Sequence, residues 1–306
     1  MSTFLELIGQ VKQQCMGFTQ NQEQIAWLAA DMTSNATTFQ VPQSEVNNVS
    51  RGLVEIGSEL IQVASFNSAT DPSTVTVAAG VNGRGYLGSD AAPHFTNDII
   101  TMDPDFPMQR VKEAINYTIN AVYPDLYVMK TYDFPKQAAI YEYPMPTESE
   151  DILRVTCDTI GPSRVKFPSQ TWRYNPQAQD DPGRGLTTGK TIQVLDFIVP
   201  GRTIHVIYTE KPGNLVNDSD DYEIVTGLPV RTQDVIMFGA CARLLSSLES
   251  SRLQQKAIES TERAPLVPAG AASNAAQYYW NLYNARLAEE RDRMNLLFPS
   301  FQTFTS

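Results

Sequence analysis

The sequence predicts an α+β fold in which a helical body carries two β insertions. Apolar residues recur at helical spacing in the first, middle and last parts of the chain. Two intervening stretches instead show short strand-like runs separated by Pro, Gly and Asp. The length of 306 residues corresponds to about two domains and allows a sizeable core.

The first 33 residues are expected to form two helices separated by a polar bend at residues 17–21. Within each helix the apolar residues lie three or four positions apart, as on one face of a helix. The first set is Phe4, Leu5, Ile8, Val11 and Cys15, and the second set is Ile25, Leu28, Ala29 and Met32.

A central helix is predicted to run to about Val122. Asp105 and Pro107 favour its start, and Pro124 ends it. Its apolar residues again share one face, which indicates that the helix packs against a core.

The last third of the chain returns to helical spacing. Thr232 is expected to cap one helix, and a proline-bearing loop is predicted over residues 259–273. A final amphipathic helix is predicted from Ala275 to Leu297, with residues 289–293 on its solvent face.

Residues 46–102 are predicted to form a small β insertion. A Gly57-Ser58 turn joins two of its strands in a hairpin. The expected strands are Leu53–Ile56, Glu59–Val63, Thr74–Val77 and Asp98–Met102.

Residues 126–225 are predicted to form a larger antiparallel β domain, a sandwich or an open barrel of roughly seven strands. The segments 1–45, 103–125 and 226–306 then make up the helical body, since separated helices most simply pack with one another. The expected strands of the larger domain are residues 127–129, 138–143, 152–156, 164–167, 191–197, 203–208 and 222–224.

The charge balance excludes one class of DNA-binding protein. The chain has 34 acidic and 23 basic residues, a net charge of -11, and its basic residues are scattered. Binding duplex DNA through its phosphates requires clustered Lys and Arg. The composition instead suits a protein that lets DNA pass without adhering to it.

The chain shows no membrane or secretion signal. No run of 18 apolar residues is present, and the start MSTFLELIGQ lacks a basic region followed by a long apolar run. The three widely spaced cysteines, Cys15, Cys157 and Cys241, fit a reducing cytoplasm.

Two glycine-rich stretches resemble phosphate-binding loops. Residues 83–88 read GRGYLG, but a dinucleotide site requires a helix that opens at the third glycine, and Pro93 would interrupt it. Residues 183–191 read GRGLTTGKT, but the first glycines do not have the spacing of a Walker A loop, and a strand-like run follows. We expect turns in both places, and no cofactor.

Residues for catalysis or metal binding are sparse. His205 is expected in a half-buried strand, and His94 in a loop beside a proline without a nearby partner. The acidic run at residues 217–223 lacks the glycine and distal glutamate of an EF-hand loop, so a solvated turn is expected. No GxSxG or CxxC motif is present. We therefore expect no catalytic residue, no metal and no enzymatic activity.

Taken in order, several segments resemble the head-to-tail connector, or adaptor, proteins of long-tailed bacteriophages. The likeness covers most of the chain as an arrangement of helices and β insertions, and the larger β domain matches least well. The segments are Arg51–Ile56, Glu59–Val63, Arg84–Gly88 with Ala91, Ala92 and His94, and the C-terminal Ala276–Trp280, Tyr283, Arg286, Leu287, Glu289, Glu290, Phe298 and Pro299.

This resemblance implies a structural protein of the virion, located in the neck and assembled in the host cytoplasm. Such proteins form a ring, usually of twelve copies, beneath the portal protein. The ring bridges the portal to the next neck or tail protein, and genomic DNA runs through its centre without sequence-specific binding. No membrane partner is expected.

Seven residues are candidates for subunit contacts. Arg84 and Tyr86 are expected at an exposed edge of the small β insertion, and the loop that contains Pro265 and Pro268 is expected to reach a neighbouring ring. The three C-terminal phenylalanines either anchor a partner or fold back on the protein's own helices. They are Phe298, Phe301 and Phe304.

Three other functions compete with the adaptor. A tail-terminator or tail-tube ring would be predominantly β. A carbohydrate-binding module would use exposed aromatic residues such as Trp172, Tyr174 and Tyr143. A nucleotide-using enzyme would need one of the two glycine-rich stretches at a phosphate.

Overall fold

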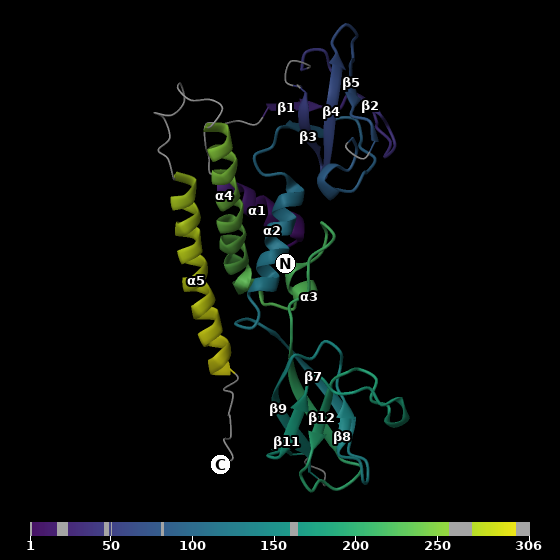
Figure 1. Ribbon diagram of the computed structural model, residues 1–306, viewed down its shortest axis with the longest axis vertical. Helices are drawn as coiled ribbons and strands as arrows, with labels where there is room; N and C mark the ends of the chain where they lie inside the picture. The colour runs from purple at the N-terminus through teal and green to yellow at the C-terminus, as the bar shows by residue number, and fades with distance from the viewer. Residues whose placement is uncertain are drawn as a thin grey trace. The chain divides into compact units, whose positions relative to one another are not determined.

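The computed structural model of the chain confirms the α+β fold, with N-terminal, central and C-terminal helices and antiparallel sheets (Figure 1). Contacts divide the chain into two compact units. The first unit comprises Ser2–Thr118 and Asp234–Tyr283, and the second comprises Ile119–Gln233 and Asn284–Ser306. The structure describes residues 2–16, 24–45, 49, 51–80, 83–159, 165–256 and 271–297.

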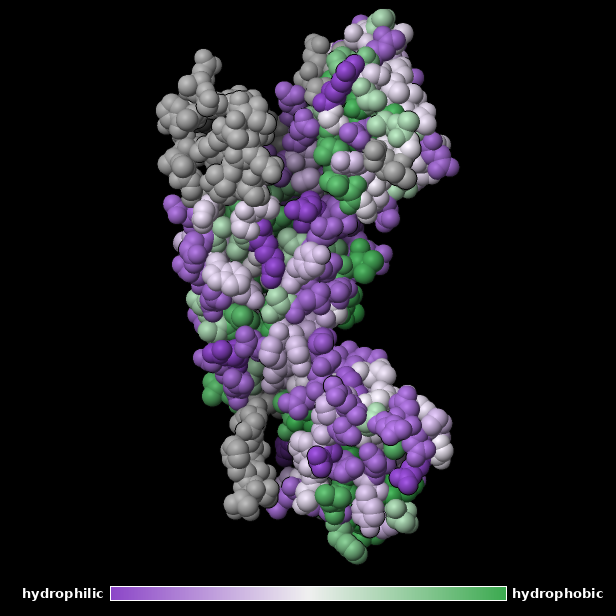
Figure 2. Space-filling view, in the orientation of Figure 1, coloured by the Kyte–Doolittle hydropathy of each residue, from purple (hydrophilic) through white to green (hydrophobic). Residues whose placement is uncertain are grey.

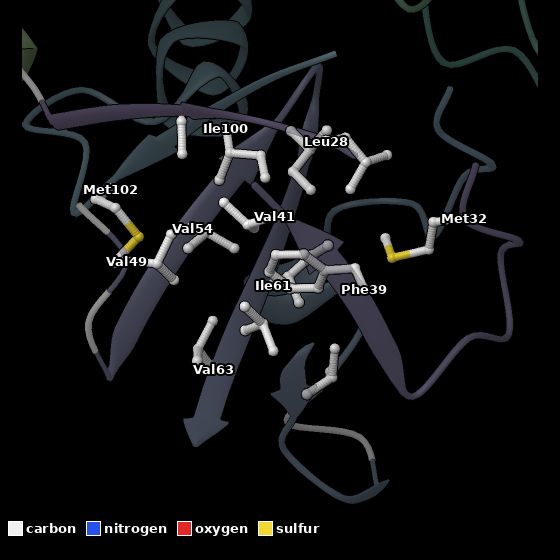
Figure 3. Close-up of a cluster of buried hydrophobic side chains, with 14 residues drawn as sticks. Leu28, Met32, Phe39, Val41, Val49, Val54, Ile61, Val63, Ile100 and Met102 are labelled. Carbon is white, nitrogen blue, oxygen red and sulfur yellow. The ribbon is translucent and has the colours of Figure 1, made fainter. Parts of the chain in front are cut away.

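The first unit contains a six-stranded antiparallel sheet that curls into a half-barrel around an apolar core (Figure 3). Its strand order is β1-β6-β3-β4-β5-β2. A hairpin joins β3 and β4, with Gly57 at φ 61° in the turn. The strands are β1 (Gln24–Trp27), β2 (Thr38–Val41), β3 (Gly52–Ile56), β4 (Glu59–Asn67), β5 (Ser73–Val77) and β6 (Ile99–Met102).

The four strands predicted between residues 53 and 102 are confirmed, and β4 continues to Asn67. Side chains from all six strands and from the segments between them fill the core. Its buried members are Ala26, Leu28, Met32, Phe39, Val41, Val49, Val54, Ile56, Ile61, Val63, Val75, Val77, Ile100 and Met102.

The second helix predicted before residue 33 is wrong, because that region contains strand β1. Burial alternates along it: Ala26 and Leu28 are buried, whereas Ile25 and Trp27 are exposed. The spacing from Ile25 to Leu28 fits a helix as well as a short strand, and four residues do not distinguish them. Strands β1 and β2 both lie within residues 1–45, which were predicted to belong to the helical body. The sheet therefore begins earlier in the chain than predicted.

Four long helices are α1 (Phe4–Met16), α2 (Met108–Ala121), α4 (Gln233–Lys256) and α5 (Ala271–Leu297). The predicted N-terminal, central and C-terminal helices are thereby confirmed. Thr3 and Glu6 form a capping box at the start of α1, in which each side chain accepts the other's backbone N–H. Helix α5 begins at Ala271, so residues 271–273 of the predicted loop are helical, and residues 257–270 lie outside the described residues.

Helices from distant parts of the chain contact one another in the first unit. The hydroxyl of Tyr279 on α5 donates to the carbonyl of Gln14 on α1 at 3.0 Å. The thiol of Cys241 on α4 lies 3.9 Å from the carbonyl of Val11 on α1. The two ends of the sequence therefore build one helical body.

A buried carboxylate links this helical body to the half-barrel. Glu55 on β3 is 5% exposed and accepts from the Lys12 ammonium on α1 at 3.0 Å. It also accepts the backbone N–H of Met108, the first residue of α2. A carboxylate at a helix N-terminus accepts a hydrogen bond from a backbone N–H that has no partner within the helix, and its negative charge interacts favourably with the helix dipole.

The larger β domain consists of two antiparallel sheets that share one core. The four-stranded sheet has the order β10-β9-β13-β7, and the three-stranded sheet has the order β11-β12-β8. The strands are β7 (Val128–Pro135), β8 (Glu142–Pro144), β9 (Asp151–Asp158), β10 (Lys166–Pro168), β11 (Trp172–Asn175), β12 (Thr191–Val194) and β13 (Thr203–Glu210).

Six of the seven strands predicted in this domain are found, with shifted ends. The seventh is wrong: residues 222–226 form the short helix α3 (Tyr222–Thr226), because the Asp221 carboxylate caps it by accepting the N–H groups of Glu223 and Ile224. Strand β11 was not predicted, although Trp172 and Tyr174 face the core and Arg173 does not. No helix in the described part of the chain is long and apolar enough to span a membrane.

Candidate functional site

The GRGYLG stretch forms a turn, as predicted. Residues 86–88 make a single 3₁₀ turn, and no α-helix follows until Met108 in the described chain. Gly85 has φ 63°, and a side chain there would place its Cβ 2.7 Å from the carbonyl oxygen of Ser89. The helix N-terminus that binds a pyrophosphate after such a motif is not formed here.

Arg84 is directed inward, so its predicted exposure is wrong. The side chain is 11% exposed, and all five of its N–H groups have acceptors within the chain. Nε and Nη2 donate to the two carboxylate oxygens of Glu59 at 2.6 and 2.8 Å. The remaining donors reach the carbonyls of Thr33, Ala36 and Ala92 at 2.7, 3.3 and 2.6 Å.

Glu59 is the centre of this cluster, and its side chain is fully buried. Besides Arg84, its carboxylate accepts the backbone N–H groups of Gly85 and Ala92 at 3.0 and 3.1 Å. Burial raises the pKa of Glu59, but the hydrogen bonds from Arg84, His94, Ala92 and Gly85 outweigh burial and lower the pKa to about 2.

His94 also belongs to the cluster, so the prediction that it has no partner is wrong. Its Nε2 lies 2.8 Å from the Glu59 carboxylate, and its backbone pairs with Met32 in an isolated β-bridge. Two segments that carry the resemblance, Glu59–Val63 and Arg84–Gly88, therefore meet at one buried carboxylate. We define the Glu59 cluster as Glu59, Arg84, Gly85, Ala92 and His94.

The other candidate interface residues are not drawn into this cluster. Tyr86 is half-buried, whereas the adjacent Leu87 is 59% exposed, with φ 55°. A contact of Tyr86 or Arg84 with another subunit stays a prediction. Pro265, Pro268, Phe298, Phe301 and Phe304 lie outside the described residues.

The GRGLTTGKT stretch also forms turns, with its lysine engaged within the chain. Gly183 and Gly189 donate their backbone N–H groups to Asp181 and Asp180 at 3.1 and 3.0 Å. The Lys190 ammonium donates to the Ser149 carbonyl at 2.5 Å, and β12 follows directly. The GRGLTTGKT stretch is therefore a loop held by hydrogen bonds to two aspartates, and it does not have the geometry of a phosphate-binding loop.

His205 lies in strand β13, as predicted, between two carboxylates that the sequence did not reveal. Its Nδ1 is 2.7 Å from Asp133 on β7, and its Nε2 is 3.1 Å from Asp158 on β9. The two partners come from the neighbouring strands of the sheet, which only the strand order brings together. Both ring nitrogens are engaged by carboxylates.

The acidic run 217–223 folds as a turn followed by a helix cap. The Asp220 carboxylate accepts the backbone N–H groups of Val216 and Asn217, both at 2.8 Å, and these bonds lower its pKa. Asp221 caps α3. Among the described residues, no cluster of three His, Cys, Asp or Glu side chains has the arrangement of a metal site.

The aromatic residues that a carbohydrate site would need are part of the larger domain's core. Tyr143 is 5% exposed, and Trp172 and Tyr174 pack against the same core. The Tyr143 and Tyr174 hydroxyls donate to the carbonyls of Ile140 and Ser149 at 2.9 and 2.8 Å. These three rings therefore form no exposed platform for a sugar.

Helix α5 carries a third buried carboxylate, which corrects the predicted solvent face at residues 289–293. Glu290 is fully buried and accepts from Arg231 at 2.9 Å and from Arg293 at 2.6 Å. Arg231 lies in the 3₁₀ turn before α4, 59 positions away in the chain, so helical spacing alone did not reveal this pair.

Comparison with known proteins does not assign the chain to a family. No model of a known protein family matches the chain, and no curated protein is significantly similar to it in sequence.

Proposed function

We propose that this protein is a structural component of a bacteriophage virion. In this proposal it forms an adaptor ring between the capsid portal and the tail, and genomic DNA passes through the central channel. The observation that carries the proposal is the contact of α1, α4 and α5, which come from opposite ends of the sequence, in one helical body that Glu55 links to the half-barrel. The same arrangement is implied by the resemblance to head-to-tail connector proteins.

The chemistry of the GRGYLG stretch supports a structural role over a nucleotide-binding one. Its arginine forms a buried ion pair with Glu59, so the donors that a phosphate would require are already engaged. The residues on which the resemblance to connector proteins is proposed hold three chain segments together, as a rigid ring subunit would require.

The charge supports a DNA channel. At -11 per copy, a ring of about twelve copies would create a strongly negative field that does not trap phosphates. The proposed partners are other copies of this chain, the portal protein and the next neck or tail protein. The proposed location is the virion neck, after assembly in the host cytoplasm.

The competing functions have less support. A tail tube or terminator is predominantly β, whereas this chain has helices of 24 and 27 residues. A sugar-binding module lacks the exposed aromatic platform formed by its predicted residues.

Co-sedimentation with the portal ring encoded in the same genome tests the proposal. We expect the chain to pellet with assembled portal rings, and to cause no shift of linear duplex DNA in a gel. Failure to pellet with the portal, or micromolar binding of ATP or NAD by the purified chain, would contradict the proposal.

A further inference from the structure

Two of the three cysteines of the chain meet where α1 and α4 contact each other. Cys15 lies on α1 and Cys241 on α4, and both are free thiols. The Cys241 thiol lies 3.9 Å from the carbonyl oxygen of Val11. In an α-helix this carbonyl accepts from the residue four positions further on, here Cys15, and side chains four positions apart share one face. Cys241 therefore contacts the turn of α1 that carries Cys15.

The two thiols interact directly, and three helices hold them in place. Their side chains form a hydrogen bond with each other, and Tyr279 on α5 interacts electrostatically with both sulfur atoms. The Tyr279 hydroxyl donates to the carbonyl of Gln14, the residue before Cys15, at 3.0 Å. The Tyr279 ring stacks on Phe238, about one turn before Cys241 on α4, with ring centroids 6.3 Å apart.

The two thiols differ in their surroundings. Along α5 the surface of the helical body is mostly hydrophilic or neutral (Figure 2), whereas Cys241 on α4 is fully buried. Cys15 is partly exposed. The hydrogen bond with Cys15, together with burial, raises the pKa of Cys241, so the Cys241 thiol keeps its proton. Because the thiolate is the reactive form of cysteine, we expect an oxidant to react first with Cys15.

The residues beside Cys241 leave room for the two sulfur atoms to move closer. A disulfide bond joins its sulfur atoms at about 2.05 Å, which is shorter than the distance between hydrogen-bonded thiols. On α4 the neighbours of Cys241 are Gly239, Ala240 and Ala242. None of them has a long side chain that would keep α1 from approaching α4.

We propose that Cys15 and Cys241 form a dithiol that a peroxide oxidises to a disulfide between α1 and α4. The Cys15 sulfur attacks one oxygen of hydrogen peroxide, the O–O bond breaks, and Cys15 becomes a sulfenic acid as one water leaves. The Cys241 sulfur then attacks the Cys15 sulfur, the S–O bond breaks, and the Cys241 proton leaves with the hydroxyl group as a second water. The two thiols together lose two electrons and two protons, and the peroxide is reduced to two molecules of water.

The disulfide would fasten the N-terminal helix to a helix from the last third of the chain. Cys241 and Val11, which lies one turn from Cys15, are 230 positions apart in the sequence. A crosslink that closes so long a loop strongly restricts the unfolded chain. A reducing cytoplasm keeps the pair as thiols, and the disulfide forms where the protein meets an oxidising environment. Both steps take place within one copy, so they require neither a ring nor a portal protein.

Oxidation of the purified wild-type chain with excess hydrogen peroxide tests the proposal. After denaturation, the number of free thiols should fall from three to one, and the remaining thiol should be Cys157 in the buried core of the larger β domain. Mass spectrometry of a tryptic digest should show the peptide with Cys15 joined to the peptide with Cys241. The midpoint of thermal unfolding should rise by about 5 °C or more, and dithiothreitol should reverse both changes.

Single alanine variants test the order of the two steps. In Cys241→Ala the Cys15 sulfenic acid has no second thiol to react with, so dimedone, a reagent for sulfenic acids, should label Cys15. In Cys15→Ala, Cys241 should stay a free thiol under the same treatment. Cys157→Ala is the matched control and should form the crosslink as wild type does. Circular dichroism verifies the fold of each variant, and the assay on the wild-type chain depends on none of them.

Several results would overturn the proposal. One is a wild-type chain that keeps all three thiols in excess peroxide. Others are a disulfide that joins two copies or includes Cys157, and dimedone labelling of Cys15 in the wild-type chain without a crosslink. Oxidation of Cys241 in Cys15→Ala would contradict the assignment of Cys15 as the thiol that reacts first.

Discussion

At the scale of single residues, the Glu59 cluster explains why a stretch that looks like a nucleotide motif carries glycine and arginine. Glu59 is fully buried, and a buried carboxylate is tolerated only when its lone pairs are satisfied. Arg84, Gly85, Ala92 and His94 satisfy them. The cluster therefore joins the β3–β4 hairpin to two loops of the half-barrel.

Removing the central carboxylate should be costly. Glu59→Ala leaves Arg84 buried without its partner, so we expect the free energy of unfolding to fall by about 3–5 kcal/mol in a denaturant titration. The matched control is Glu289→Ala on α5, an exposed carboxylate paired with Arg286, which should change stability by less than about 0.5 kcal/mol. If the two variants lost similar amounts of unfolding free energy, the buried cluster would stabilise the fold no more than an exposed ion pair does.

The same cluster predicts a pH dependence. Because the folded protein holds the pKa of Glu59 at about 2, below the reference value of 4.5, the unfolded chain takes up the proton first as the pH falls. The contribution to stability is complete above about pH 5 and is lost towards about pH 2. The unfolding free energies of wild type and Glu59→Gln, measured across this pH range, should differ less as the pH falls. A difference that stays constant with pH would contradict the lowered pKa of Glu59.

At the scale of elements, close helix packing defines the body of the first unit. Gly239 on α4 faces α2 and α5 at short range: a Cβ there would lie 2.4 Å from Cγ2 of Thr118 and 2.9 Å from Cδ2 of Tyr283. Only glycine permits this approach without displacing buried neighbours.

Because of this packing, alanine substitutions at two glycines should change the free energy of unfolding in opposite directions. Gly239→Ala should lower the free energy of unfolding by about 1–3 kcal/mol through overpacking. Gly9→Ala on α1, where an added Cβ meets nothing within 4 Å, should raise it by about 0.5–1 kcal/mol through helix propensity. Thermal unfolding of the two variants checks both signs, and equal shifts would contradict the packing argument.

Elements with long periodic patterns were predictable from sequence, whereas short ones and their contacts were not. The pattern of α2 extends over several turns, so its existence and type followed directly. Strand β1 and helix α3 have four and five residues, too few to establish a period. For the site, Arg84 was found by its motif, but its partner Glu59 is 25 positions away and becomes a neighbour only through the half-barrel.

At the scale of the whole molecule, the net acidic charge bears on the proposed role around DNA. A net charge of -11 disfavours adhesion to DNA and makes each copy repel others at long range. Specific association then requires a contact that combines apolar anchors with opposite local charge.

Electron microscopy of the purified protein, alone and mixed with the portal ring of the same genome, tests the proposed adaptor most directly. We predict closed rings with a central channel, stacked coaxially on the portal. Particles that neither form a ring nor join the portal under either condition would contradict the assignment.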